Sequence, residues 1–408
     1  MNMRRFVFAA VSAFLLAAAP LTAYADNDAA TETSASEEVT EAATEKPSKQ
    51  TTEDGFYNYG FDENGNVELY DFNMQGYLGE VVIPSEIEGK PVVYLGNACF
   101  LEAFNITSVV IPATVTDMGE SVFFGCKSLE KISVEEGNSY FSVTEDGVLL
   151  GDDGKFFICY PPGKKDEFYT IPDGVDELAP GCFAYTQHLR GVDIPDTVGY
   201  IDNLAFSHSG IERISIPDSV VQIDDYSFAY CENLAEVDLG NGVESIYHAA
   251  FAFCPKLTEI EFPPSVTLIG QYAFCGTGME SVTIPATVTD INFCAFGYDE
   301  DLSPIGDFVI YGEPYSMAQT YCTANDSEND YQNNFTFVSL ANPEATIASD
   351  PDSSSDSSDA EETPGEAASD NKLIVGLAVC GGIVLVLAAV LIVLLVKKPK
   401  TKKQGEKK

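Results

Sequence analysis

Histidines, cysteines and paired carboxylates are the residues of this chain that could do chemistry. His188, His208 and His248 fall at different places within the internal repeat described below, so they line up neither in a ladder nor in a metal-ligand set. The sequence has no H-E-x-x-H, G-x-S-x-G, Walker A or G-x-G-x-x-G motif, and its Cys/His spacings match no zinc site. We therefore expect scattered surface or edge histidines, no catalytic residue, no metal and no cofactor.

Two acidic turns, 62–66 and 152–155, contain oxygen ligands of the kind that calcium prefers. Both lack the twelve-residue ligand series of a calcium loop. Each also lies between segments of alternating apolar residues. The pattern favours hairpin turns over calcium sites.

The cysteines point to packing rather than to cross-linking. Nine of the ten lie before the apolar C-terminal segment, and an odd number cannot all pair. A slot three residues after a phenylalanine holds either cysteine or a small hydroxyl residue: Cys126, Cys231, Cys254, Thr186, Ser209 and Thr277. A small buried side chain explains this slot. The alternative is a disulfide between neighbours such as Cys231 and Cys254, which adjacent coils could bring close.

One unit recurs along the middle of the chain. Its pattern is clearest in 257–274, Leu-x-x-Ile-x-Phe-Pro-x-x-Val-x-x-Ile-x-x-x-Ala-Phe, and its period is 22 or 23 residues. The marker phenylalanines are Phe100, Phe123, Phe183, Phe206, Phe228, Phe251, Phe274 and Phe296. Only one interval, of 60 residues, departs from the period. The sequence therefore predicts about eight coils.

The chemistry of the unit predicts a β-rich solenoid. Alternate apolar residues give a short strand one buried face, and the proline that follows ends the strand. Val266 and Ile269 should point inward on the return path, while Ala273 and Phe274 should stack against the same residues of the next coil. No coil can bury its apolar face alone, so stability becomes a sum over stacked coils.

The ends and the long interval predict additional elements. Residues 55–82 resemble a β-hairpin that caps the N-terminal end, and the first unit carries a five-residue insertion between Ile83 and Phe100. The region near 135–170 predicts a hairpin that projects from the solenoid. Residues 316–325 have helical character and 335–338 predict a last strand, which together would cap the other end.

These motifs resemble a known family. Ile-Pro-x-x-Val-x-x-Ile followed by Ala-Phe-x-x-Cys-x-x-Leu is similar to the BspA-type leucine-rich repeats of bacterial and some protist surfaces, over about 80–310. The resemblance extends to the hairpin before Tyr160, the segment 83–92 and the closing 310–312, and so to most of residues 55–340. It implies a leucine-rich-repeat fold and a role as a surface adhesin or interaction protein, and it implies no catalytic residues.

The two ends predict export and anchoring. Residues 1–25 place Arg4 and Arg5 before an apolar run and end in Ala-Tyr-Ala, which is typical of a secretory signal peptide. Residues 373–396 are apolar and without charge, long enough for one transmembrane helix. The lysine-rich segment 397–408 follows directly, so the positive-inside rule predicts a cytoplasmic tail and an extracellular N-terminal ectodomain in the cell membrane.

The remaining segments complete the predicted organisation. Residues 26–54 and 341–372 are rich in small and acidic residues and poor in aromatics, which predicts a disordered linker and a disordered acidic stalk. Residues 55–340 form the predicted ectodomain. They contain 45 Asp and Glu against 9 Lys and Arg, a balance that repels phosphate backbones. We therefore expect no nucleic acid partner.

The exposed face of the strand ladder is the predicted binding surface. Residues between the inward Leu and Ile side chains point to solvent and form a polar, mostly acidic strip. The candidate ligand-binding residues are Arg190, Asp193, Glu212, Arg213, Glu236, Asp238, Glu259 and Glu261. An ordinary solvated face would have the same composition, so both interpretations stay open.

The predicted function is binding of a surface protein or glycan by a membrane-anchored bacterial surface protein, without catalysis. The alternative is a structural envelope spacer with no specific ligand. An enzyme acting through paired carboxylates would be supported by the acidic strip alone, and a binding face needs acidic residues equally often.

Overall fold

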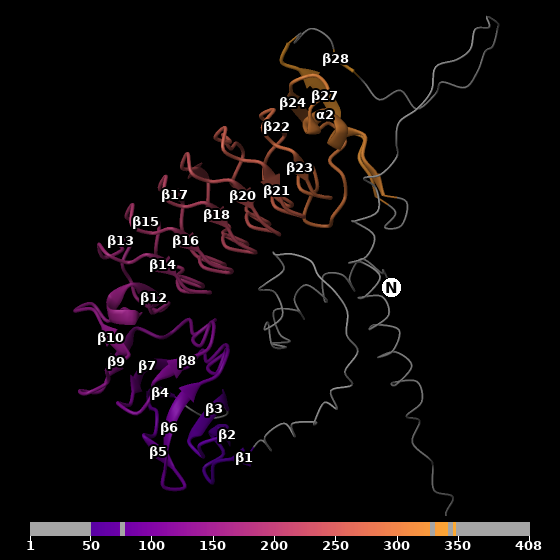
Figure 1. The fold of residues 1–408 in the computed structure, drawn as a ribbon. Helices are drawn as coiled ribbons and strands as arrows, with labels where there is room; N and C mark the ends of the chain where they lie inside the picture. Colours follow the sequence, from indigo (N-terminus) through magenta and orange to yellow (C-terminus); the bar gives the residue numbers. More distant parts are fainter. Residues whose placement is uncertain (1–49, 74–77, 327–330, 342–345, 348–408) are drawn as a thin grey trace, which may run out of the picture. The chain divides into compact units, whose positions relative to one another are not determined.

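The computed structural model describes residues 50–73, 78–326, 331–341 and 346–347. This part of the chain winds into a β-rich leucine-rich-repeat solenoid of about 11 turns with little helix (Figure 1). The predicted signal peptide, transmembrane helix and cytoplasmic tail lie outside the described residues, as do most of the predicted linker and stalk. Within the described ranges, no helix is long and apolar enough to span a membrane.

The strands that open the coils line one surface of the solenoid, which we call the first ladder, and they pair in parallel within four separate short sheets. Its strands are β4 (Gly79–Val82), β7 (Ile106–Ile111), β9 (Lys131–Val134), β13 (Phe168–Thr170), β15 (Gly191–Asp193), β17 (Arg213–Ser215), β19 (Glu236–Asp238), β22 (Ser281–Thr283), β24 (Val309–Gly312) and β27 (Thr336–Ser339). Paired strands are one coil apart, as in Ile214 opposite Val237. The eight coils predicted from the phenylalanines are present, and three more contain β9, β24 and β27.

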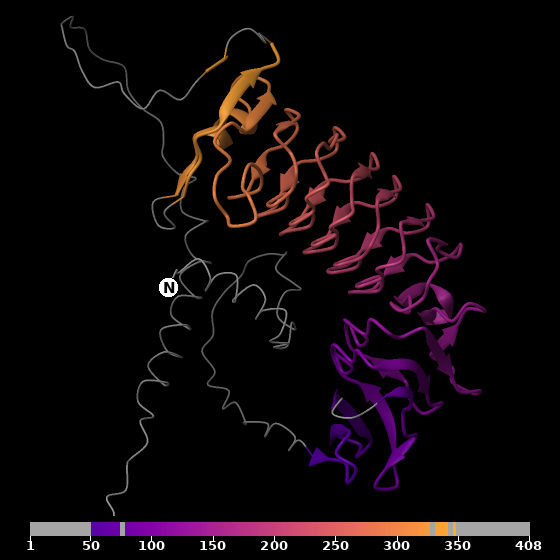
Figure 2. The same ribbon diagram turned by 180° about the vertical axis from the view of Figure 1, so that it is seen from behind.

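The Val-x-x-Ile segment after each proline forms a second ladder. Its strands are β6 (Lys90–Leu95), β8 (Asp117–Met118), β12 (Phe156–Cys159), β14 (Glu177–Leu178), β16 (Tyr200–Ile201), β18 (Gln222–Ile223), β20 (Ser245–Ile246), β21 (Leu268–Ile269) and β23 (Asp290–Ile291). From β12 to β23 successive strands run side by side in both views (Figures 1 and 2). Val198 and Ile201 are fully buried, as the repeat pattern predicts for Val-x-x-Ile.

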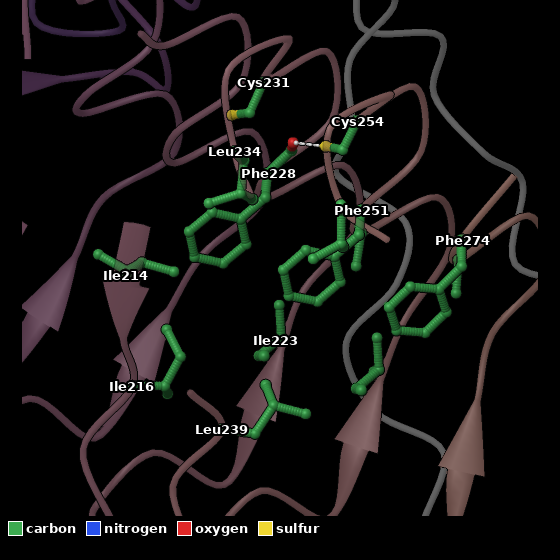
Figure 3. Packing of buried hydrophobic residues seen from close by; sticks show 14 of the residues in the cluster. Ile214, Ile216, Ile223, Phe228, Cys231, Leu234, Leu239, Phe251, Cys254 and Phe274 are labelled. Atoms are coloured by element: carbon green, nitrogen blue, oxygen red, sulfur yellow. Dashed lines mark hydrogen bonds between the residues drawn. The ribbon is translucent and has the colours of Figure 1, made fainter. Parts of the chain in front are cut away.

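Stacked phenylalanines fill the interior between the ladders. Figure 3 shows Phe228, Phe251 and Phe274 lying above one another, one from each coil. Their ring centroids are 5.0 and 5.3 Å apart, and the ring planes differ by 2° and 7°. All eight marker phenylalanines are at most 3% exposed. The predicted register of the repeat is therefore confirmed.

The N-terminal hairpin is present, and it extends the second ladder. β2 (Tyr57–Phe61) and β3 (Val67–Phe72) pair antiparallel, and β3 continues in parallel to β6. Asp62 accepts hydrogen bonds from the backbone N–H groups of Asn64 and Asn66, so the first acidic turn is a hairpin turn, as predicted. The insertion in the first unit contains β5 (Glu86–Ile87), which pairs with β6. That this end is a cap stays a prediction.

The prediction of a projecting hairpin between 135 and 170 is only partly correct. β10 (Phe141–Val143), β11 (Leu149–Gly151) and β12 do pair antiparallel, and the second acidic turn forms the short 3-10 helix η1 (Asp152–Gly154) between β11 and β12. However, β12 also pairs in parallel with β14. Phe157 is fully buried and stacks on Phe183 at 4.7 Å. The hairpin therefore supplies a stacked ring within the 60-residue interval, which contains no marker phenylalanine.

The C-terminal end contains the predicted helix and strand. α2 (Met317–Cys322) packs on β24, and β27 overlaps the predicted last strand 335–338 with a shift of one residue. β25 (Asn325–Asp326) pairs with β26 (Tyr331–Gln332). Regular structure extends beyond 55–340 at both ends, because β1 (Gln50–Thr51) pairs with β2 and β28 (Thr346–Ile347) pairs with β27. Residues 50–51 and 346–347 belong to segments whose composition predicted disorder. They form strands because their backbone pairs with an open strand edge.

Candidate binding surface

The predicted ligand-binding residues are all exposed, and they lie on a strand of the first ladder, directly before one, or at the equivalent place in the coil 257–274, which forms no first strand: Arg190, Asp193, Glu212, Arg213, Glu236, Asp238, Glu259 and Glu261. Inward neighbours such as Leu189 and Ile214 are buried at 1% and 4% exposure. The alternation predicted from the repeat is therefore present. Asp193, Arg213, Glu236 and Asp238 lie on paired strands, so these side chains project from a rigid base.

Arginine lies at one end of this strip and is paired there. Arg190 donates a hydrogen bond to Glu212 from the next coil, and its Nε lies 3.9 Å from a carboxylate oxygen of Glu167. The guanidinium of Arg213 lies over the ring of Phe168, 5.6 Å from its centroid. These pairs are exposed, so they contribute little to folding stability. They do fix the directions of two cationic side chains.

The carboxylates form the rest of the strip. Asp193 accepts a hydrogen bond from the hydroxyl of Thr170 at 3.1 Å, and Asp238 accepts one from Ser215 at 3.2 Å. Glu236 lies opposite Arg213 in the β17–β19 register. The strip thus changes from mixed charge near β15 and β17 to uniformly acidic from β19 to 261. Such a surface is complementary to a partner with basic or hydroxyl-rich groups.

The prediction of surface or edge histidines is wrong for two of the three. His188 is exposed, with its Nε2 3.1 Å from the Nζ of Lys165. His208 is partly buried in a stack of aromatic rings, and its centroid lies 4.5 Å from Tyr185 and 4.6 Å from Tyr230. His248 is also partly buried, hydrogen bonded to the hydroxyl of Tyr226 at 2.8 Å.

This aromatic ladder is a feature that the sequence analysis missed. Its rings are Tyr185, His208, Tyr230 and Phe253, from four consecutive coils, and Phe124, which packs on Tyr185 from a coil before the insert. The first four lie two residues after a marker phenylalanine, so the spacing that defines the repeat could have found them. Burial lowers the pKa of His208 to about 4, and nearby Lys127 lowers it further in the same direction. His208 is therefore neutral at physiological pH.

Replacing His208 with tyrosine should make the protein less sensitive to acid. In the wild type the folded state binds this proton only near pH 4, whereas the unfolded state binds it near pH 6.5. The contribution of neutral His208 is thus fully present above pH 6.5 and is lost as the pH falls toward 4. At pH 5 the loss reaches about 2 kcal/mol by this linkage. Tyr185 and Tyr230 already occupy the same place in adjacent coils.

Urea unfolding of wild type and H208Y between pH 7.5 and 5 measures the effect. Both proteins keep every carboxylate and His248, so the difference between their pH profiles isolates His208. Parallel profiles over this range would show that His208 has the same pKa in the folded and unfolded states and that its burial has no electrostatic consequence.

The cysteines are packing residues, as predicted. All nine in the described part of the chain are free and buried. Cys231 donates to the backbone carbonyl of Phe206 at 3.1 Å, and Cys254 donates to that of Phe228 at 3.2 Å, the bond drawn in Figure 3. Burial raises the pKa of Cys126 and Cys182 well above the usual thiol value, so these groups are poor nucleophiles. Among the described residues no group of three His, Cys, Asp or Glu could hold a metal ion.

The fold and the repeat together define a leucine-rich-repeat solenoid protein. The family described as BspA type leucine rich repeat region matches six copies in this chain, over residues 65–144 and 169–303. The chain therefore belongs to the BspA-type leucine-rich-repeat family, whose surface proteins its repeat motifs resemble. A comparison with curated proteins found no match.

Solved structures with a similar fold come from several bacteria. A leucine-rich repeat protein from Eubacterium ventriosum is 17% identical over 55% of this chain and 93% of its own, with a TM-score of 0.36. A leucine rich cell surface protein from Faecalibacterium prausnitzii is 20% identical over 70% and 100%, with a TM-score of 0.33. The pneumococcal vaccine antigen PcpA is 21% identical over 61% and 66%, with a TM-score of 0.41.

Proposed function

We propose that this protein is a membrane-anchored bacterial surface protein that binds a protein or glycan partner through its leucine-rich-repeat ectodomain. The observation on which the proposal rests is the strand face of the first ladder, where the candidate residues lie exposed on consecutive coils. Family membership supports a surface role. The arrangement suits recognition, because a rigid ladder presents charged groups at fixed spacing without further ordering on binding.

Anchoring and orientation in this proposal rest on the sequence alone. The support is the predicted signal peptide at 1–25, the apolar segment 373–396 and the basic segment 397–408, which together favour an ectodomain outside the cell. The strand face would then meet extracellular partners. No catalysis is included in the proposal, because the exposed carboxylates of the strip lie along a ladder without a nucleophile and base in catalytic motifs.

Removing four charges from the acidic part of the strip should weaken partner binding. The variant replaces Glu236, Glu259 and Glu261 with glutamine and Asp238 with asparagine. We expect the dissociation constant for the captured partner to rise about tenfold, since the variant loses charge complementarity over two coils. The measurement is binding of the purified full chain to immobilised host-cell and bacterial surface fractions, followed by titration.

A matched variant controls for net charge. It neutralises four exposed carboxylates that lie off the strand face: Asp173, Asp196, Glu232 and Glu244. It should bind as the wild type does. Equal weakening by both variants would show that total charge, and not the strand face, determines binding.

The regularity of the array favours a second candidate, a spacer without a specific ligand. From Phe183 to Phe296 the stacked rings keep centroid distances of 4.9 to 5.3 Å, as a rod of uniform coils requires. Deleting two whole internal coils separates the two functions. A spacer keeps its role with a shorter reach, whereas a binder loses part of the strip and therefore affinity.

A further inference from the structure

The second ladder is interrupted after β8. In later coils the strands from β14 to β21 each pair on both sides, as β14 does with β12 and β16. Among the described strands, β8 pairs only with β6, and β10 pairs only with β11. The hairpin insert enters the chain at this point and resumes the ladder at β12. The two hydrophobic cores of the molecule also divide in this region.

A cavity of about 550 Å³ lies at this interruption. One wall is 116–124, which includes β8, with Asn97 beside it. The other wall is made of 139–141, 151–153, 156 and 158–159 of the insert, together with 179–181 of the coil that follows. Its volume is within the range of ligand sites in proteins. The cavity therefore lies where the next strand of the ladder would be expected.

The floor of the cavity is apolar. Met118, Phe141, Phe156 and Ile158 line it and are partly buried against the two cores. Tyr140 also lines the cavity and is 55% exposed, which is unusual for a large aromatic side chain. The floor offers contacts for apolar side chains or for the aliphatic part of a lysine.

The rim of the cavity is acidic. Asp117, Glu120, Asp152 and Asp153 line it and are exposed, and the lining contains neither lysine nor arginine nor histidine. This charge disfavours the protein's own acidic segments 26–54 and 341–372 as occupants. It favours a cationic ligand.

The backbone at the open edge of β8 is available for strand pairing. In the later coil, the carbonyl of Leu178 accepts a hydrogen bond from the N–H of Asp202 in the next coil at 3.1 Å. Met118 occupies the same place in its own coil as Leu178. The N–H of Met118 donates to the carboxylate of its neighbour Asp117 at 2.8 Å, a local partner that a ligand carbonyl could replace.

We propose that this cavity binds an extended basic peptide, which adds to the edge of β8 as a strand. The peptide backbone pairs with β8, alternate apolar side chains contact the floor, and lysine or arginine side chains meet the four carboxylates of the rim. This proposal rests on the proposed binding function, but it places a peptide site away from the strand face of the first ladder.

Calorimetric titration of the full chain in detergent micelles tests the proposal. The probe is the capped hexapeptide of alternating valine and lysine, compared with the same peptide N-methylated on the strand-pairing residues. The N-methylated peptide keeps the charges but loses backbone donors, so it should bind about tenfold more weakly. Equal binding of the two peptides, or no binding of the parent peptide, would overturn the proposal.

Matched variants locate the site. D152N with D153N removes two rim charges, and asparagine tolerates the positive φ of both positions, 47° and 52°. Tyr140→Ala removes exposed aromatic surface only. Each should weaken the parent peptide at least about fivefold. The control E232Q with E244Q removes the same charge away from both the cavity and the strand face and should change affinity less than about twofold.

The two proposals fail separately. If the control weakens peptide binding as much as D152N with D153N does, the peptide responds to net charge and the cavity site is excluded. Binding of the strand-face variant to the cell-surface fractions would then still test the proposed function. Conversely, selective loss with the cavity variants supports the peptide site even where the strand face binds nothing.

Discussion

Replacing Phe251 with alanine should lower the free energy of unfolding by about 3 to 5 kcal/mol, the range for emptying a large core site. Phe251 is fully buried, and its ring stacks on Phe228 at 5.0 Å and on Phe274 at 5.3 Å. The alanine variant loses both ring contacts at once. Neighbouring coils are held by backbone hydrogen bonds, so they cannot collapse far into the space. Phe228→Ala should behave alike.

Thermal and urea unfolding of the full chain, followed by circular dichroism, measure this loss. The matched control is Cys231→Ser in the same stack of coils, which should cost far less. The equivalent slot in the preceding coil is already Ser209, whose hydroxyl lies 3.3 Å from the Cys231 sulfur. An unchanged midpoint in the phenylalanine variants would mean that the stacked rings do not determine stability.

The coils could be predicted because each residue's burial follows from its place in a local period. Phe206 and Ile201 are inward at positions that the repeat alone assigns. The exposed site residues followed from the same alternation. The side-chain pairs on that face, such as Arg190 with Glu212, could not be predicted, because they depend on the lateral register between coils. The repeat period suggests this register but does not fix it.

The aromatic ladder could not be predicted from residue propensities. Tyr185, His208, Tyr230 and Phe253 all have φ near 60°, a left-handed conformation that costs such residues about 1 to 2 kcal/mol each. Hydrogen bonds from one coil to the next offset this cost, for example from the N–H of His208 to the carbonyl of Ala229 at 2.9 Å. Both the conformation and the stacking exist only once coils have assembled.

The place of the hairpin insert was also beyond sequence reasoning. Its turn and its alternating strands are local features and were predicted. β12 joins the second ladder, and Phe157 stacks on Phe183. Both contacts depend on how the chain re-enters the solenoid after about one and a half repeat periods of irregular sequence. The cavity beside β8 is a consequence of that return.

The orientation of the chain in the membrane has the largest expected effect, because it determines whether any extracellular partner can reach the strand face or the cavity. Protease added to intact cells, where the outer layers admit it, should cut within 341–372 and release the ectodomain. A short membrane fragment that ends at Lys408 should survive. The positive-inside rule predicts this result, since basic residues follow the apolar segment directly and acidic residues precede it.

Changing Lys397, Lys398, Lys400, Lys402 and Lys403 to serine should weaken retention of the C-terminal tail inside the cell, because those charges set the orientation and stop transfer. Epitope tags at the two ends, probed with antibody before and after lysis, follow both sides of the membrane in one experiment. Protection of the repeats in intact cells, with cleavage only after lysis, would contradict the orientation. The solenoid would then face the cytoplasm, and both the strand face and the peptide cavity would need intracellular partners.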